Sequence, residues 1–227
     1  MKKYLLAILF ISLFGQVQSQ NTINQNLKAE LDSIYKSDQF FREYLDSEIT
    51  DARKSEILKE TGYTDDGSFR SRVWSMINVQ DSINIIKVEK IISRYGYPGK
   101  SLVGEPTNES AWYVIQHSKK ISNYLPLIEE AATKGEIPFT RFAMMQDRYL
   151  TQQGKEQIYG TQAQGKLIAN KQTGKEEFFT YISPIQNPEK VNERRKKAGF
   201  TTTVEENAKR MRIEYKVYTL DDIAKIF

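Results

Sequence analysis

Apolar residues recur at helical spacing along most of the chain. In the first such segment, Leu27, Leu31, Ile34 and Tyr35 fall at positions i, i+4, i+7 and i+8. This spacing places their side chains on one face of a helix. The pattern therefore predicts helical structure over about 24–60, ended by the glycine and aspartate turn residues that follow.

The same periodicity continues through the middle of the chain. A pair of helices is predicted over about 68–95, with Ser82 as the N-cap of the second and Gly96 as its stop. Three shorter helices are predicted over about 108–119, 123–135 and 138–153. The middle one contains Pro126, which we place in its first turn, where the missing amide hydrogen has no helical acceptor.

The pattern changes toward the C-terminus. Apolar runs at 167–169 and 178–182 flank a turn-rich stretch, which predicts a β-hairpin. A basic helix is predicted over about 187–199, and the alternation over 213–218 indicates one more strand. We therefore expect a mostly α fold, a single helical domain over 20–227 with a small β-hairpin element near the C-terminus.

The N-terminus has the pattern of a secretory signal. Lysines precede an apolar run from Leu5 to Phe14, which is shorter than the roughly 20 residues that span a bilayer. Val17 and Ser19 have the small size required before a signal peptidase site. We expect cleavage of residues 1–19 and a mature chain in the periplasm or outside the cell. The alternative is an uncleaved membrane anchor.

Composition narrows the classes of partner. The chain holds no cysteine, which excludes thiol catalysis, thiolate metal sites and a lipid anchor on a cysteine. Lys and Arg number 33 against 29 Asp and Glu, and two of the lysines lie in the predicted signal. This balance argues against nucleic acid as a partner, and the basic run at 194–197 is interpreted as a solvated helix face. No second apolar run has membrane length, so no membrane span is expected after cleavage.

His117 is the only histidine, and it lies away from the apolar face of the predicted 108–119 helix. Imidazole exchanges protons near neutral pH without a large pKa shift, so His117 is the first candidate for acid/base chemistry. The alternative is an ordinary surface or capping residue. One histidine makes no multi-histidine site, and no phosphate-binding glycine pattern or hydrolase motif is present, so no metal and no cofactor are predicted.

The predicted 138–153 helix carries polar residues on its apolar face. Gln146 falls in the middle of that face and Asp147 at its edge, and buried polar groups require hydrogen-bond partners. Asp147 belongs either to a site or to a structural network in which it pairs with Arg148 or Arg42. The polar loop over 157–162 that follows this helix could bind a polar ligand through its amide groups.

Short polar motifs in a fixed order suggest a family. They are Asp38-Gln39-x-x-Arg42, Asp81-x-x-Asn84, Gln116-His117, Asp147-Arg148 and Gln157-x-Tyr159-Gly160-Thr161-Gln162. With these motifs the chain resembles, over about 25–200, an uncharacterised bacterial domain of unknown function found in Bacteroidetes and actinobacteria. That family has no established activity, so the resemblance implies no reaction. In similar proteins an acidic residue commonly follows soon after the Gln-His pair, whereas Ser118, Lys119 and Lys120 follow it here, so no acidic partner is expected from that loop.

A polar set drawn from separate segments is more naturally a pocket than a core, so we expect these residues to converge around His117. The predicted catalytic residues are His117, Asp147 and Asp81. The predicted binding residues are Asp38, Gln39, Arg42, Asn84, Gln116, Arg148, Gln157, Tyr159, Thr161 and Gln162.

Two functions follow from this set. In the first, the protein is a hydrolase that acts on a small polar substrate, with His117 as general acid/base oriented by Gln116 or Asp81. In the second, it is a non-catalytic binding or interaction module of the cell envelope. The sequence leaves both open and makes no prediction of oligomeric state.

Overall fold

The computed structural model describes residues 22–46, 48–64, 67, 69–169 and 174–226. The predicted signal peptide over 1–19 lies outside these residues. The described part is mostly helical with one antiparallel hairpin near the C-terminus, which confirms the predicted fold class. No helix in the described ranges combines the length and the apolar character that crossing a membrane requires.

Three helices form the N-terminal part: α1 (Gln25–Leu45), α2 (Asp51–Thr61) and α3 (Phe69–Tyr95). The side chain of Asn24 caps α1 by accepting the Leu27 amide hydrogen. The predicted pair over 68–95 is wrong, because α3 is one continuous helix. Ser82 lies inside it, and its hydroxyl donates to the Asn78 carbonyl instead of capping a helix.

Short helices connect α3 to the centre of the molecule: α4 (Lys100–Val103), η1 (Thr107–Glu109), α5 (Ser110–His117), α6 (Ile121–Thr133) and α7 (Phe139–Gln152). The predicted bounds of α7 are confirmed to within one residue. Helix α6 begins at Ile121, earlier than predicted, and the Ile121 side chain is buried in the core. Pro126 therefore lies in the second turn, and its predicted first-turn position is wrong.

The C-terminal part contains the hairpin of β1 (Ala163–Ala169) and β2 (Glu176–Ile182), then η2 (Pro188–Lys190), α8 (Val191–Lys197), α9 (Val204–Arg210) and α10 (Leu220–Ile226). Residues 213–218 form no strand, so that prediction is wrong. Their alternation instead places Ile213 and Tyr215 against the apolar cluster beside α9. Helix α9 was not predicted, although Thr203 and Glu206 form a capping box at its start.

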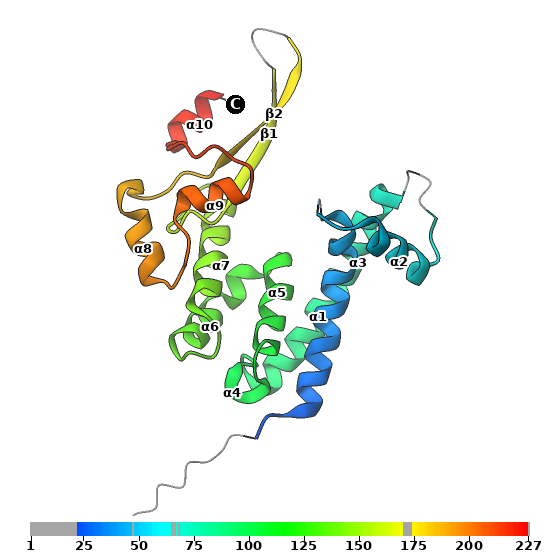
Figure 1. Ribbon diagram of the computed structural model, residues 1–227. Helices are drawn as coiled ribbons and strands as arrows, with labels where there is room; N and C mark the ends of the chain where they lie inside the picture. Colours follow the sequence, from blue (N-terminus) through cyan, green and yellow to red (C-terminus); the bar gives the residue numbers. More distant parts are fainter. Residues whose placement is uncertain (1–21, 47, 65–66, 68, 170–173, 227) are drawn as a thin grey trace, which may run out of the picture.

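Three apolar clusters hold these elements together. The largest joins α1, α3, α5, α6 and α7 around Leu31, Trp112 and Ile128. A second joins α1, α2 and the start of α3, and a third lies under α8 and α9. Helix α5 lies beside α1, and α7 stands between α5 and the C-terminal helices (Figure 1). This arrangement brings the end of α5, and with it His117, close to α1.

Candidate functional site

His117, the last residue of α5, faces a buried carboxylate on α1. Its Nδ1 lies 3.2 Å from Oδ2 of Asp38 and 3.4 Å from Oδ1. Asp38 is 1% exposed and also accepts a 2.6 Å hydrogen bond from the Gln39 amide. An ionised carboxylate can only accept, so this contact places the proton on Nδ1 and leaves the Nε2 lone pair directed away from Asp38.

Arg42 occupies the other side of the imidazole. Its Nε donates to His117 Nε2 over 3.3 Å, and its Nη1 donates to the Asp38 carbonyl. Its Nη2 lies 2.9 and 2.8 Å from the two carboxylate oxygens of Asp81 on α3. Arg42 is held by three elements of the fold, which fixes its guanidinium beside the imidazole.

Asp38, Asp81 and His117 form the group best suited to a metal ion among the described residues. Each offers one ligand atom, and these atoms all lie within 4.8 Å of one another. The Arg42 guanidinium, however, already donates to both Asp81 and His117. A metal would have to displace this cation, so the geometry fits a charge-paired network better than a ligand set.

A cavity of about 610 Å³ opens beside His117. It is lined by Tyr35, Gln39, Arg42, Glu43, Leu45, Asp46, Trp74, His117 and Arg148. We call it the His117 pocket. Arg148 reaches it from α7, and burial lowers the pKa of its guanidinium. No acidic side chain of the described residues forms an ion pair with Arg148, so a positive charge in the pocket wall is left uncompensated.

Asn84 and Gln116 do not line this pocket. Asn84 is fully buried between α1 and α3, where its Oδ1 accepts from Ser37 and Gln80 at 3.0 and 2.9 Å. Its Nδ2 has no partner among the described residues. Gln116 is half-buried on α5. Asn84 therefore contributes to the packing of α1 against α3 next to the site.

Asp147 belongs to a different network. It is 0% exposed, and its carboxylate accepts the backbone amides of Ile158 (2.7 Å), Tyr159 (3.0 Å) and Thr161 (3.0 Å) as well as the Thr161 hydroxyl (2.9 Å). Burial raises the pKa of Asp147, and these hydrogen bonds act in the opposite direction. It pairs with neither Arg148 nor Arg42. The 157–162 loop covers this part of α7, so Asp147 is more buried than Gln146, contrary to expectation.

The 157–162 loop is fixed on both of its faces. The amide of Gln157 donates to the carbonyls of Gln162 and Ser183 and accepts the Gln162 amide hydrogen. The Tyr159 carbonyl accepts from Arg195 over 2.8 Å. Gly160 has a φ of 68°, and a Cβ there would lie 2.6 Å from the Val204 side chain. The loop therefore needs glycine at this position for both reasons.

The predicted residues thus separate into two groups. Around His117 the structure brings together Asp38, Gln39, Arg42, Asp81 and Arg148. Around Asp147 it gathers Gln157, Tyr159, Thr161 and Gln162. Tyr35 and Trp74 also line the His117 pocket. The sequence did not indicate them, because aromatic residues at helical spacing are usually interpreted as core residues.

The family described as "Family of unknown function (DUF6624)" matches residues 42–220. The chain belongs to this family. Searches of curated proteins and of solved structures returned no significant match.

The DUF6624 match supports the resemblance drawn from the sequence to an uncharacterised domain. It includes Arg42, Asp81, His117 and the 157–162 loop. Asp38 lies just before the matched residues, although its carboxylate is the nearest acidic partner of His117 Nδ1. The site described here therefore extends beyond the DUF6624 match at its N-terminal side.

Proposed function

We propose that this DUF6624 protein is an exported hydrolase that binds a small anionic substrate in the His117 pocket. The observation that carries the proposal is the position of His117 between a buried carboxylate and an open cavity. Asp38 orients the ring through Nδ1. Nε2 becomes available for proton transfer when a bound water replaces the 3.3 Å contact from Arg42 Nε, while Arg42 stays paired with Asp81.

The pocket offers two guanidinium groups for the substrate. Its wall also holds two carboxylates, Asp46 and Glu43, of which Glu43 is paired with Arg53. Arg42 and Arg148 both line the pocket, and Arg148 has no acidic partner among the described residues. A guanidinium without a carboxylate partner is suited to a carboxylate or phosphate group. Arg42, held by Asp81, lies where it can stabilise negative charge that develops beside His117.

Water is the proposed nucleophile. The described residues that line the pocket include no serine, threonine or cysteine side chain. His117 Nε2 would take a proton from water as the water oxygen bonds to the electrophilic carbon or phosphorus of the substrate. The proton would then pass to the leaving group as its bond breaks. Tyr35 and Trp74, which is 59% exposed, offer apolar surface at the pocket for the rest of the substrate.

The second candidate is a non-catalytic binding module of the cell envelope. It is favoured by one observation, that both imidazole nitrogens already have protein partners. Arg42 contacts Nε2 and Asp38 contacts Nδ1. A network satisfied in this way can fix the walls of a binding pocket without chemistry.

The test is turnover on a panel of small carboxylate esters and phosphate esters with His117→Ala and Asp38→Asn. We expect wild-type turnover and a loss of about 100-fold or more in His117→Ala, the usual contribution of acid/base catalysis. Arg148→Gln should raise KM with less effect on kcat. Gln116→Ala is the matched control, since Gln116 neighbours His117 but does not line the pocket.

Melting curves of every variant separate loss of chemistry from loss of folding. Unchanged turnover in a folded His117→Ala variant would refute the hydrolase. Saturable binding that depends on Arg148, together with no wild-type turnover across the panel, would establish the binding module instead.

A further inference from the structure

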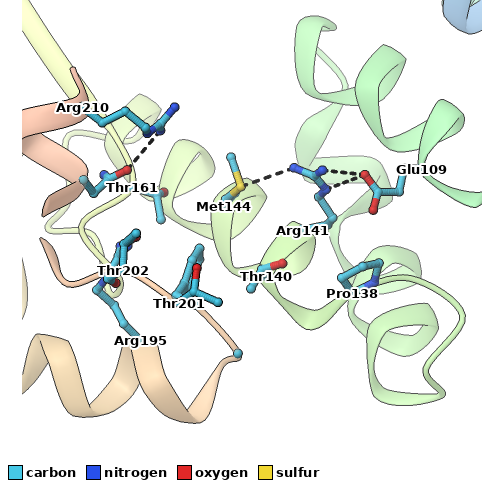
Figure 2. Close-up of a pocket in the computed structure, with 13 residues that line it drawn as sticks. Glu109, Pro138, Thr140, Arg141, Met144, Thr161, Arg195, Thr201, Thr202 and Arg210 are labelled. Carbon is cyan, nitrogen blue, oxygen red and sulfur yellow. Dashed lines mark hydrogen bonds and ion pairs between the residues drawn. The ribbon is translucent and has the colours of Figure 1, made fainter. Parts of the chain in front are cut away.

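A second cavity lies between α7 and the segment that joins α8 to α9 (Figure 2). Its volume is about 520 Å³. It shares no lining residue with the His117 pocket. We call it the arginine-threonine cavity, after Arg141, Arg195, Arg210, Thr140, Thr201 and Thr202, which line it.

Positive charge dominates this cavity. Its one carboxylate, Glu109, is already paired with Arg141, at 2.6 Å from Nη2 and 2.8 Å from Nε. Arg195 and Arg210 form no ion pair with any acidic group of the described residues. The Arg210 guanidinium donates instead to the neutral Asn207 side chain over 3.1 Å. Two guanidinium charges are therefore left for a ligand.

Arg195 is the stronger indication, because it is 2% exposed. Its guanidinium donates to the carbonyls of Thr202 and Tyr159, each at 2.8 Å, and to the Thr202 hydroxyl at 3.0 Å. It also stacks on the Phe200 ring at 4.5 Å. Asp147, Glu205 and Glu206 attract it at longer range, but it forms no ion pair with any of them. A buried cation held only by neutral oxygens is costly, and a bound anion would offset that cost.

Hydroxyl groups complete the donor set. Thr201 and Thr202 follow Gly199, and Thr140 faces the same space from α7 (Figure 2). The hydroxyls of Thr140 and Thr201 have no hydrogen-bond partner within the described residues. Guanidinium and hydroxyl donors gathered around one space match the oxygens of a phosphate group better than those of a planar carboxylate.

We propose that the arginine-threonine cavity binds a small phosphate monoester. Its two guanidinium groups without a direct ion pair, Arg195 and Arg210, match a phosphate dianion. The cavity is larger than phosphate alone, and Pro138, Met144 and Phe200 supply an apolar wall for a small organic group. The proposal rests on residues that the hydrolase proposal does not use, so either can fail without the other.

The test measures binding of inorganic phosphate and of glycerol 3-phosphate by calorimetry at low salt, with amide chemical shifts as a site-specific readout. We expect saturable binding, tighter for the ester, with the largest shifts at Thr201 and Thr202. Arg210→Gln should weaken binding about tenfold, which corresponds to one charge-assisted hydrogen-bonding contact. Lys209→Gln, an adjacent exposed change of the same charge outside the cavity, should leave binding unchanged.

Three further variants separate binding in this cavity from other effects. Thr201→Val removes one exposed hydroxyl and should weaken binding several-fold, whereas Thr201→Ser should retain it. Arg148→Gln should leave the phosphate-induced shifts at Thr201 and Thr202 unchanged, because Arg148 lines only the His117 pocket. The proposal would be overturned by equal losses in Lys209→Gln and Arg210→Gln or by loss of the Thr201 and Thr202 shifts in Arg148→Gln. Absence of saturable shifts at Thr201 and Thr202 up to about 10 mM would also overturn it.

Discussion

Replacement of Asp147 by asparagine tests whether this carboxylate anchors the 157–162 loop. In the structure the carboxylate accepts three backbone amides and one hydroxyl from that loop. Asparagine keeps the shape but offers one oxygen, and its NH₂ group would face N–H donors. The change therefore removes hydrogen bonds without making a large cavity.

The expected loss can be worked from these contacts. One or two of the four donors lose their acceptor, since the Tyr159 amide contacts both carboxylate oxygens, and each buried unsatisfied donor costs about 1–3 kcal/mol. Burial raises the pKa of Asp147, so removal of the charge recovers part of this loss. We expect Asp147→Asn to lower the free energy of unfolding by about 3 kcal/mol, a large share of the typical 5–15 kcal/mol.

Urea unfolding followed by circular dichroism measures this difference. The matched control is Asp221→Asn, the same chemical change on exposed α10, where no ion pair or side-chain hydrogen bond links Asp221 to the described residues. Its effect should stay within about 0.5 kcal/mol. The chemical shifts of the His117 ring should change little in either variant.

A loss below about 1 kcal/mol in Asp147→Asn would refute the anchoring role, since even one orphaned buried amide should cost that much. An altered slope of the urea dependence would show that the variant unfolds from a different state. Full stability combined with lost turnover would return Asp147 to the catalytic role predicted from the sequence.

Three further predictions test other features. Gly160→Ala should destabilise the protein by about 2 kcal/mol or more in thermal or urea unfolding, because its Cβ would lie 2.6 Å from a side chain; Gly154→Ala, at a similar φ of 67° with open space, should cost about 1 kcal/mol. The hydrogen bond from Lys120 lowers the pKa of Glu89, so this pair stabilises the fold above pH 4.5 and loses that effect as pH falls through the lowered pKa. The difference in unfolding free energy between wild type and Glu89→Gln should therefore shrink on acidification, and a constant difference would contradict this. N-terminal sequencing of the exported protein should begin at Gln20, and an intact N-terminus would refute the cleavage site.

The spacing of apolar residues predicted a helix well where that helix packs a single apolar face against a single core. Helix α7 is the best case for its bounds, and Phe142 and Ala143 are buried as the spacing indicates. Phe139, expected on the same face, is 37% exposed, whereas Met145 outside that face is fully buried. The break predicted at Ser82 failed because a serine inside a helix can bond to the preceding turn as readily as it can cap a new one. The strand predicted over 213–218 was wrong because burial of alternate residues against one apolar cluster produces the same sequence pattern as a strand.

The sequence indicated many residues of the candidate site, but it did not show which of them lie together. Asp38 and His117 are 79 residues apart, and no local pattern says which carboxylate meets the imidazole. The sequence pointed to Asp81 or Gln116, whereas packing of α5 against α1 selects Asp38. In the same way, nothing in the polar 157–162 loop shows that its amides turn inward onto Asp147 instead of outward to a ligand.

The adjacent residues Asp147 and Arg148 connect the two groups through α7. Neighbouring positions on a helix point about 100° apart, so one helix turn directs the carboxylate into the loop network and the guanidinium into the His117 pocket. Asp147 is satisfied entirely by loop donors and makes no ion pair with Arg148. Arg148 thereby keeps its charge uncompensated in the pocket wall, which is the property that anion binding requires. The Asp-Arg motif is thus best explained as a loop anchor followed by a pocket cation, two roles that its sequence alone does not distinguish.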